Sequence, residues 1–237
     1  DHRDLHSLPT RRSSDLANWA LRGGLSAKQK LALQFIFALP LAYLLVAWVG
    51  LDTRIYFPIF KELHLELGDI GYIIFATLFI VFFSNAVNIT DGLDGLAIGV
   101  TLTTFAVGAF VAYLAGNKVY AEYLGIPYVP YVGELTILAM ALLGAGLAFL
   151  WFNTHPARIF MGDVGSLALG ALLALFALLT KSEFIFLIAG GVFVMEILSV
   201  VLQVTVCKLT KRGEKNGKAD CKRLFLMAPL HHHFEKL

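Results

Sequence analysis

The sequence predicts an all-α, polytopic transmembrane helix bundle of about six spans, and three observations lead to this fold class. Of the 237 residues, 58% are hydrophobic and 15% are charged, with a mean hydropathy of +0.73, which is too apolar for an ordinary soluble domain. Long apolar runs recur along the chain, and each approaches the roughly 20 residues that a helix needs to cross a bilayer. No run shows the alternation of a transmembrane β-strand.

The apolar runs define the expected helices in chain order. They lie near residues 31–50, 70–87, 96–115, 135–152, 166–180 and 184–206. The fifth run is short for a span and is expected to borrow flanking residues. Residues 17–237 are therefore expected to form a single transmembrane domain that ends in a cytoplasmic C-terminal tail.

The first sixteen residues do not match the rest of the chain. Residues 1–16 have no apolar periodicity and no apolar core of a signal peptide. We interpret them as a non-native or disordered segment and exclude them from the expected fold.

Basic residues are distributed unequally between the two sides that alternating spans create. One side carries Arg22, Lys28, Lys30, Arg158, Lys208, Lys211, Arg212, Lys215, Lys218, Lys222, Arg223 and Lys236. The other side carries only Arg54, Lys61, Lys118 and Lys181, each with acidic neighbours. The positive-inside rule makes the first side cytoplasmic. The small net charge of +2 gives no reason to expect a nucleic-acid partner.

Three polar segments, each at the end of an apolar run, fall on that predicted cytoplasmic side. They are residues 85–95, 153–166 and 229–235, here called the first, second and third loops. Carboxylates, amides and histidines are costly near a membrane and commonly mark functional sites. We therefore expect the three loops to build one composite site.

The first loop contains Asn85, Asn88, Asp91 and Asp94 at intervals of three residues. On a helix each of these side chains would face the next one. Converging amides and carboxylates can hold a hydrated cation, a sugar or a base. The alternative is a capped helix end with solvated aspartates, but the number of polar residues in so short a segment favours a site.

The second loop contains Asp163, just before the helix expected to begin near Ser166. A helix start attracts phosphate, and a carboxylate there would need a cation such as Mg²⁺ between itself and the phosphate. The alternative, an N-cap without further function, is equally compatible with this aspartate alone. Phe160 is either a stacking surface for a planar ring or an interfacial anchor, and the Asn153 amide can read a base edge.

The third loop contains three adjacent histidines, His231, His232 and His233. Successive helical side chains point about 100° apart, so these three cannot all bind one metal from a regular helix. Phosphate binding or proton transfer is the better interpretation, and a remnant purification tag is improbable. Gln203 is either a further polar contact or an ordinary juxtamembrane residue. Glu196, inside the last run, receives lower weight because it can simply pair within the bundle.

These motifs resemble the phospho-N-acetylmuramoyl-pentapeptide-transferase family of polyprenyl-phosphate sugar-1-phosphate transferases. The resemblance rests on residues 24–30, 85–95, 152–170 and 227–235. The segments Phe-Met-Gly-Asp-Val-Gly-Ser and Ala-Pro-Leu-His-His-His-Phe-Glu are the most specific. The second of them favours this family over relatives that transfer N-acetylglucosamine-1-phosphate.

The resemblance implies a Mg²⁺-dependent enzyme of peptidoglycan synthesis in the bacterial inner membrane. It would transfer phospho-N-acetylmuramoyl-pentapeptide from its UDP-linked donor to undecaprenyl phosphate, giving lipid I and UMP. Besides these substrates, membrane lipid is an expected partner, and a homodimer is one possibility. The implied catalytic residues are Asp91, Asp94, Asp163, His231, His232 and His233, with Asp163 as the Mg²⁺ ligand. The implied substrate-binding residues are Asn85, Asn88, Asn153, Phe160 and Gln203.

The chain also departs from this family. The family has about ten spans, an Asp-Asp-x-x-Lys motif upstream of the position of Gly24, and a final helix after the histidines. None of these occurs in the sequence, so we expect a central fragment that is inactive or nearly so by itself.

Three other functions remain as alternatives. A related polyprenyl-phosphate N-acetylhexosamine-1-phosphate transferase would carry the same loops and use another donor. An ion-coupled transporter would place its acids near the bilayer midplane and show repeat symmetry, neither of which is evident here. A non-catalytic membrane scaffold is the third.

Overall fold

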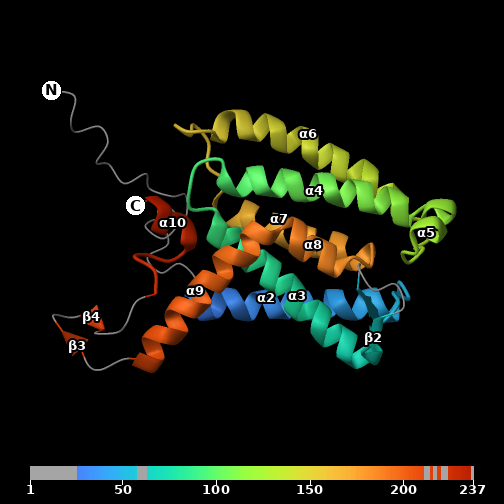
Figure 1. Ribbon diagram of the computed structural model, residues 1–237, viewed down its shortest axis with the longest axis horizontal. Coiled ribbons are helices and arrows are strands. Elements are labelled where there is room, and N and C mark those ends of the chain that lie inside the picture. Colours follow the sequence, from blue (N-terminus) through green and yellow to red (C-terminus); the bar gives the residue numbers. More distant parts are fainter. Residues whose placement is uncertain (1–25, 58–62, 211–213, 216–217, 220–223, 236–237) are drawn as a thin grey trace.

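A computed structural model describes residues 26–57, 63–210, 214–215, 218–219 and 224–235 (Figure 1). The segment 1–16 and much of the basic tail, whose state was predicted above, lie outside the described residues. The helices are α2 (Ala27–Ala47), α3 (Gly68–Thr90), α4 (Leu96–Ala115), α5 (Lys118–Leu124), the 3₁₀ helix η1 (Val132–Glu134), α6 (Leu135–Asn153), α7 (Gly162–Leu179), α8 (Glu183–Ala189), α9 (Gly191–Thr210) and α10 (Leu230–Glu235). The short strands are β1 (Arg54–Tyr56), β2 (His64–Glu66), β3 (Glu214–Lys215) and β4 (Lys218–Ala219).

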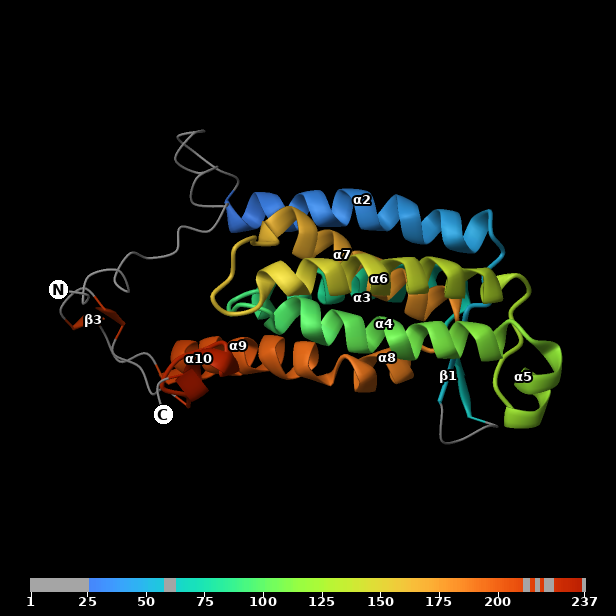
Figure 2. The same cartoon turned by 90° about the horizontal axis from the view of Figure 1, so that it is seen from above.

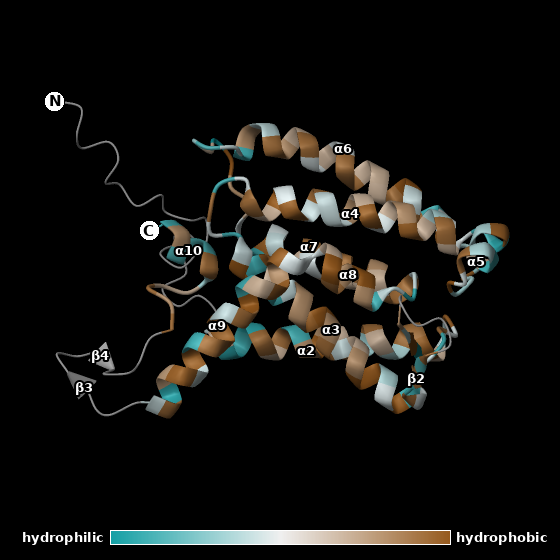
Figure 3. Cartoon of the chain, viewed as in Figure 1, coloured by the Kyte–Doolittle hydropathy of each residue, from teal (hydrophilic) through white to brown (hydrophobic). Residues whose placement is uncertain are grey.

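Six helical segments in the described part of the chain are long and apolar enough to cross a membrane. They are α2, α3, α4, α6 together with η1, α7 and α9. The predicted fold class, an all-α polytopic membrane bundle, is thereby confirmed. Figure 3 shows hydrophobic residues over the helices, with hydrophilic residues more frequent toward their ends.

Two of the expected spans have other bounds in the structure, and one of these differences was expected. The run 184–206 does not form one span, because α8 ends at Ala189 and α9 begins at Gly191. The glycine pair Gly190 and Gly191 has the lowest helix propensity after proline and is a common place for a helix to break. The fifth span does gain flanking residues as expected, since α7 begins at Gly162 rather than near residue 166.

The core of the bundle lies where α3 packs against α7. At Gly170 of α7, an added Cβ would lie 2.4 Å from the Phe83 carbonyl oxygen and 2.6 Å from the Ser84 Cα. The Ser84 hydroxyl donates to the Leu167 carbonyl oxygen at 2.9 Å, which joins the two backbones at the same level. Because only glycine leaves room for this approach, one residue sets the distance between the two central helices.

Phenylalanines fill the space beside this contact. The rings of Phe75 and Phe79 have centroids 5.5 Å apart, and those of Phe79 and Phe83 have centroids 4.9 Å apart. The four-residue spacing puts these rings on one face of α3, and Phe83 is completely buried. The outer helix α2, in contrast, exposes large side chains such as Ile36 and Phe37, as expected for a surface that faces lipid.

The helices run alternately in opposite directions, so their connections gather at two ends of the bundle (Figures 1 and 2). The end of α3, the start of α4, the end of α6, the start of α7, and α10 all lie at one end. The hairpin β1–β2, α5 and the turn between α7 and α8 lie at the other, here called the far end. All three polar loops thus share one end.

A buried ion pair closes the far end. The Lys181 ammonium group donates to the Asp52 carbonyl oxygen at 2.7 Å and to the Tyr72 hydroxyl at 2.9 Å, and lies 3.4 Å from Glu183 Oε1. The Tyr72 hydroxyl donates to the same carboxylate at 2.9 Å. Burial lowers the pKa of Lys181 and raises the pKa of Glu183, and the opposite charge of each partner counteracts that effect.

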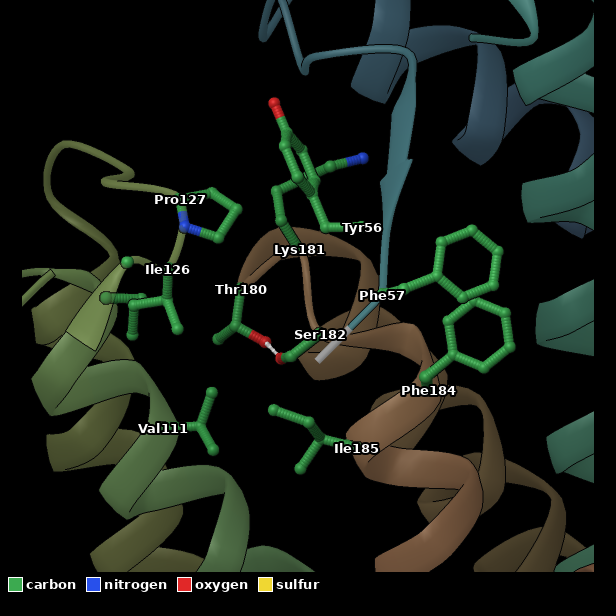
Figure 4. Close-up of a pocket in the computed structure, with 12 residues that line it drawn as sticks. Tyr56, Phe57, Val111, Ile126, Pro127, Thr180, Lys181, Ser182, Phe184 and Ile185 are labelled. Carbon is green, nitrogen blue, oxygen red and sulfur yellow. Dashed lines mark hydrogen bonds between the residues drawn. The ribbon is translucent and has the colours of Figure 1, made fainter. Parts of the chain in front are cut away.

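A mainly apolar pocket lies beside this ion pair (Figure 4). Its walls include Tyr56 of β1, Pro127 after α5, Val111 of α4 and Phe184 of α8. The pocket is therefore at the opposite end of the bundle from the three polar loops and does not belong to the same site.

Candidate functional site

Asp163 is the centre of a polar cluster that three helices build. It is the second residue of α7, and its carboxylate forms an ion pair with Lys30 near the start of α2. The Asn88 amide of α3 donates to Asp163 Oδ1 at 3.1 Å and to the Ser166 hydroxyl at 2.9 Å. Residues far apart in the sequence thus converge on one carboxylate.

The structure places Asp163 differently from the N-cap interpretation. The N-cap of α7 is Met161, and Asp163 lies within the first helical turn. The carboxylate therefore sits close to the positive end of the helix dipole and beside the Lys30 ammonium group. About a third of its side chain, 33%, is exposed, so an added ligand can reach it.

Asn85 lies about one helical turn from Asn88, toward the middle of α3, and binds α2. Its amide N–H groups donate to Gln34 Oε1 at 2.6 Å and to the Val81 carbonyl oxygen at 2.8 Å. Asn85 therefore links α3 to α2 at the level just inside the Lys30–Asp163 pair.

The four polar residues of the first loop do not all lie on one helix, and the helix end that was kept as an alternative is present at Asp91. Helix α3 ends at Thr90 with Asp91 as its C-cap, so Asp94 lies in the loop rather than on the helix face. Its Oδ2 accepts from the Ala157 backbone N–H at 3.1 Å and lies 3.2 Å from His155 Nδ1. Asp94 consequently binds the second loop instead of facing Asn88.

Asn153 also joins the first two loops. Its side-chain oxygen accepts from the Gly95 N–H at 3.0 Å, and its side-chain N–H donates to the Ile159 carbonyl oxygen at 2.8 Å. The side chain is buried, and both ends of its amide bind backbone. Phe160 follows Ile159 and is 42% exposed, so its ring is accessible at the surface of the second loop.

His231 ties the third loop to the first. Its backbone N–H donates to Glu196 Oε1 at 3.1 Å, and its Nδ1 lies 3.1 Å from Glu196 Oε2. Its ring packs on Gly92 so closely that an added Cβ there would lie 2.2 Å from Nε2. Glu196, which received low weight from the sequence, is buried and connects α9 to this junction.

The other two histidines point elsewhere. His232 Nδ1 lies 2.9 Å from Glu235 Oε2, and His233 Nδ1 accepts from the Leu226 N–H at 3.1 Å. This divergence agrees with the helical geometry that argued against one shared metal. Within the described residues, no group of three or more histidine, cysteine or acidic side chains comes together around a possible metal position.

Gln203 lies on α9, where it holds the chain that leads into α10. Its Oε1 accepts from the backbone N–H groups of Leu224 and Phe225 at 3.0 and 3.1 Å. The contact shows how Gln203 fixes the approach to the histidines. The part of the site that sequence analysis missed is on α2, where Lys30 and Gln34 are four residues apart and share a helix face. Lys30 was counted as a topogenic charge and within the segment 24–30 that carries the resemblance, but not as a site residue.

Asp163 offers too few oxygen ligands to hold Mg²⁺ alone, but its carboxylate suits a Mg²⁺ ion that is also bound by substrate phosphates. Mg²⁺ prefers hard oxygen ligands and is commonly bound by one or two carboxylates plus phosphate. Asp163 supplies one carboxylate, and the Lys30 ammonium group, which pairs with it, could also bind a phosphate. The residues present therefore fit a cation that arrives with a phosphorylated ligand.

Comparison with known proteins finds relatives that are similar over most of the chain. Residues 15–181 match the model of glycosyl transferase family 4. A phospho-N-acetylmuramoyl-pentapeptide-transferase of Aquifex aeolicus is 54% identical over 212 residues, which cover 90% of this chain and 56% of the relative. The transferases of the same name from Hydrogenobaculum and Caulobacter are 54% and 49% identical over 213 and 221 residues.

The chain spans a little over half the length of these relatives. The family match includes the site residues Lys30, Asn88 and Asp163. Glu196 and the three histidines of the third loop lie beyond residue 181, where the match ends. Because the family model matches well over half of the residues, the chain belongs to glycosyl transferase family 4.

Proposed function

We propose that the protein transfers phospho-N-acetylmuramoyl-pentapeptide from its UDP-linked donor to undecaprenyl phosphate, giving lipid I and UMP. The observation that carries this proposal is the Asp163 carboxylate at the start of α7, held by Lys30 and Asn88 at the end of the bundle that also holds the other polar loops. The names of the similar transferases support the choice of phospho-N-acetylmuramoyl-pentapeptide as the transferred group.

The reaction needs charge neutralisation and positioning more than covalent protein chemistry. A phosphate oxygen of the lipid attacks the sugar-linked phosphorus of the donor, the new P–O–P bond forms, and the bond to UMP breaks. Bound Mg²⁺ would neutralise the phosphate charges when held by Asp163. Lys30 and the free N–H groups at the start of α7 add positive potential at the same place.

The remaining loop residues are proposed to position the donor. Asp91 and Asp94 are proposed to border the catalytic region, and the exposed Phe160 ring to face the uridine, while the buried Asn153 amide, bound to the Gly95 and Ile159 backbone, holds that loop in place. His231, His232 and His233 are proposed to serve the phosphate and sugar region, although each ring has a different partner in the described chain, and Gln203 holds the chain before them. Asn85 and Asn88 complete the side formed by α3.

We further propose that this end faces the cytoplasm from the bacterial inner membrane. The positive-inside rule supports this orientation, because Lys28, Lys30, Arg158 and Lys208 belong to the side with the polar loops. A soluble nucleotide and a membrane-bound lipid phosphate would then meet at the interface without either crossing the bilayer.

A chimera tests the proposed reaction. Residues 26–235 replace the matching segment of the Aquifex aeolicus transferase, and lipid I formation is measured with Mg²⁺ and either UDP-N-acetylmuramoyl-pentapeptide or UDP-N-acetylglucosamine. We expect turnover with the first donor and little with the second. A preference for UDP-N-acetylglucosamine would contradict the proposed donor, and a well-folded chimera that transfers neither would contradict the proposed activity.

Within an active chimera, Asp163→Asn isolates the metal role. The amide keeps the size of the side chain but loses the negative charge that attracts Mg²⁺. We expect turnover to fall by about 10²–10³-fold, the usual scale for losing one electrostatic group at a reacting centre. Asp69→Asn, in the first turn of α3 at the far end, is the matched control and should leave turnover unchanged. Undiminished Mg²⁺-dependent turnover of the Asp163 variant would contradict the metal role.

A further inference from the structure

Exposed tyrosines gather at the far end of the bundle, in a part of the chain that the proposed reaction does not use. Of the eight tyrosines in the chain, Tyr113, Tyr120, Tyr123, Tyr128 and Tyr131 occur within nineteen consecutive positions, 113–131. All five are exposed, with Tyr123 at 84% and Tyr131 at 89%. The segment after α4, residues 117–131, is here called the tyrosine segment.

Helix α5 within this segment has an outward surface that is aromatic and apolar. Ala121 is fully buried against the bundle, while Val119 and Tyr123 are 72% and 84% exposed. Lys118 and Glu122 are the charged residues of the tyrosine segment. Such a surface is unusual in contact with bulk water but typical of the zone between lipid headgroups and acyl chains.

The backbone holds the tyrosine segment tightly against the end of the bundle. The Val129 N–H donates to the Ala115 carbonyl oxygen at 3.0 Å, which returns the chain to the last residue of α4. At Gly116, an added Cβ would lie 2.4 Å from the Gly133 backbone nitrogen, so the backbone segments that precede and follow the tyrosine segment are in close contact. The segment therefore stays at one height relative to α4 and does not extend away from it.

The length of α4 sets that height. Its 20 residues at about 1.5 Å per residue span about 30 Å, the thickness of the hydrocarbon core. If Gly95, before α4, lies at one boundary of that core, Ala115 lies at the other. The tyrosine segment then falls within the adjacent headgroup layer, at the depth where tyrosine rings are enriched in membrane proteins.

The tyrosine segment is continuous with the lipid-facing surface of α4. Tyr113 lies on α4, is 52% exposed, and has its ring centroid 6.0 Å from that of Tyr120 on α5. The aromatic surface thus begins on a membrane-spanning helix and extends without interruption over α5. Figure 2 shows α5 directly beyond the ends of α4 and α6.

The neighbouring hairpin at the same end has a different character. Arg54 of β1 binds Glu66 of β2 at 3.1 Å, and the Tyr56 hydroxyl donates to Asp52 at 2.6 Å. These exposed charged groups suit an aqueous environment. The charged contacts of the hairpin therefore distinguish it from the tyrosine segment, while Trp48 at the C-cap of α2 adds a further exposed aromatic ring at the far end.

From these observations we propose that the tyrosine segment is an interfacial anchor that binds the phospholipid headgroup boundary of the leaflet opposite the three polar loops. The rings place their apolar faces among acyl chains and their hydroxyls among headgroups and water. Because α4 and α6 carry Gly95 and Asn153 at their other ends, an anchor here also sets the depth of the candidate site.

Tryptophan fluorescence in vesicles tests the anchor independently of any enzymatic activity. In a background where Trp19, Trp48 and Trp151 are replaced by Phe, a single tryptophan is introduced as Tyr123→Trp. The protein is reconstituted into phosphatidylcholine–phosphatidylglycerol vesicles containing lipids brominated near the headgroup or near the acyl terminus. We expect blue-shifted emission, strong quenching by the shallow bromines and weak quenching by the deep ones.

His64→Trp, on the exposed strand β2, is the matched control at the same end of the molecule. We expect aqueous acrylamide to quench it more strongly than the tryptophan at position 123. Tyr131→Trp provides a second probe of the segment if the first variant does not fold. Equal acrylamide quenching at positions 123 and 64 would overturn the proposal. Protection from acrylamide without quenching by brominated lipid would also overturn it, because a second copy or another protein would then cover the surface.

Discussion

At the level of single residues, the contact between Gly92 and His231 joins loops that are distant in the sequence. The first loop ends α3, whereas the third contains α10, and His231 of the third loop packs on Gly92 while its backbone N–H binds the buried carboxylate of Glu196. A hydrogen atom at Gly92 leaves just enough space for the imidazole ring. The absence of a side chain is thus a structural requirement at this residue.

Replacing Gly92 by alanine should disrupt this junction. The new methyl group would occupy the position of the His231 ring, which burial and Glu196 prevent from moving freely. We expect a loss of about 1–3 kcal/mol in stability, as for other overpacked sites. Thermal unfolding in detergent and protease sensitivity of residues 224–235 measure the effect. Gly99→Ala, where an added Cβ meets nothing within 4 Å, should preserve both properties, and equal sensitivity of the two variants would contradict the contact.

Lys181 provides a second residue-level prediction, at the far end. Lys181→Met should leave the buried carboxylate of Glu183 without its counter-charge and cost about 3–5 kcal/mol. Adding Glu183→Gln removes that uncompensated charge, so the double variant should regain part of the lost melting temperature. A double variant that is less stable than Lys181→Met would show that the ion pair is not what stabilises this turn.

At the level of elements, the separation of α3 and α7 positions Asn88 beside Asp163. Gly170 permits the close approach, and the Ser84–Leu167 hydrogen bond fixes the relative height of the two helices. Asn88 lies one turn beyond Ser84, and Asp163 one turn before Leu167. The polar cluster therefore depends on backbone packing inside the bundle.

Gly170→Ala should separate the two central helices. Its Cβ would overlap the Phe83 carbonyl oxygen, a backbone atom that cannot rotate away as a side chain can. We expect a lower melting temperature, by an amount corresponding to about 1–3 kcal/mol. Gly144→Ala in α6, where the added carbon meets nothing within 4 Å, is the control and should be neutral or slightly stabilising. A Gly170 variant as stable as the control would contradict the proposed packing.

The helices also show why the sequence predicted the membrane spans well but not the points where helices break or end. Long apolar runs indicate spans reliably, because any buried or lipid-facing helix of that length needs them. The break at Gly190 was missed because hydropathy continues across it, and the glycine pair alters backbone conformation rather than polarity. The end of α3 is equally hidden in the spacing from Asn85 to Asp94, which remains helical although the helix ends at Thr90.

At the level of the whole molecule, the two ends of the bundle make a prediction about topology. In a background without Cys207 and Cys221, Thr154→Cys lies in the second loop and His64→Cys on the exposed strand β2 at the far end. With the proposed orientation, a membrane-impermeant maleimide should label position 64 in spheroplasts and position 154 only after permeabilisation. Labelling of position 154 in intact spheroplasts would reverse the orientation.

Composition, run length and the positions of charged residues were enough to predict a multi-pass helical protein with its polar loops on one side. Each of these signals is local, because the energy of placing a residue in lipid or water depends mainly on that residue and its immediate neighbours. The pairing of Lys30 with Asp163, the bridge made by Asn153, and the contact of His231 with Gly92 required the tertiary structure. Those contacts depend on how closely α2, α3, α7 and α9 approach, which glycines and buried side chains distant in the sequence decide together.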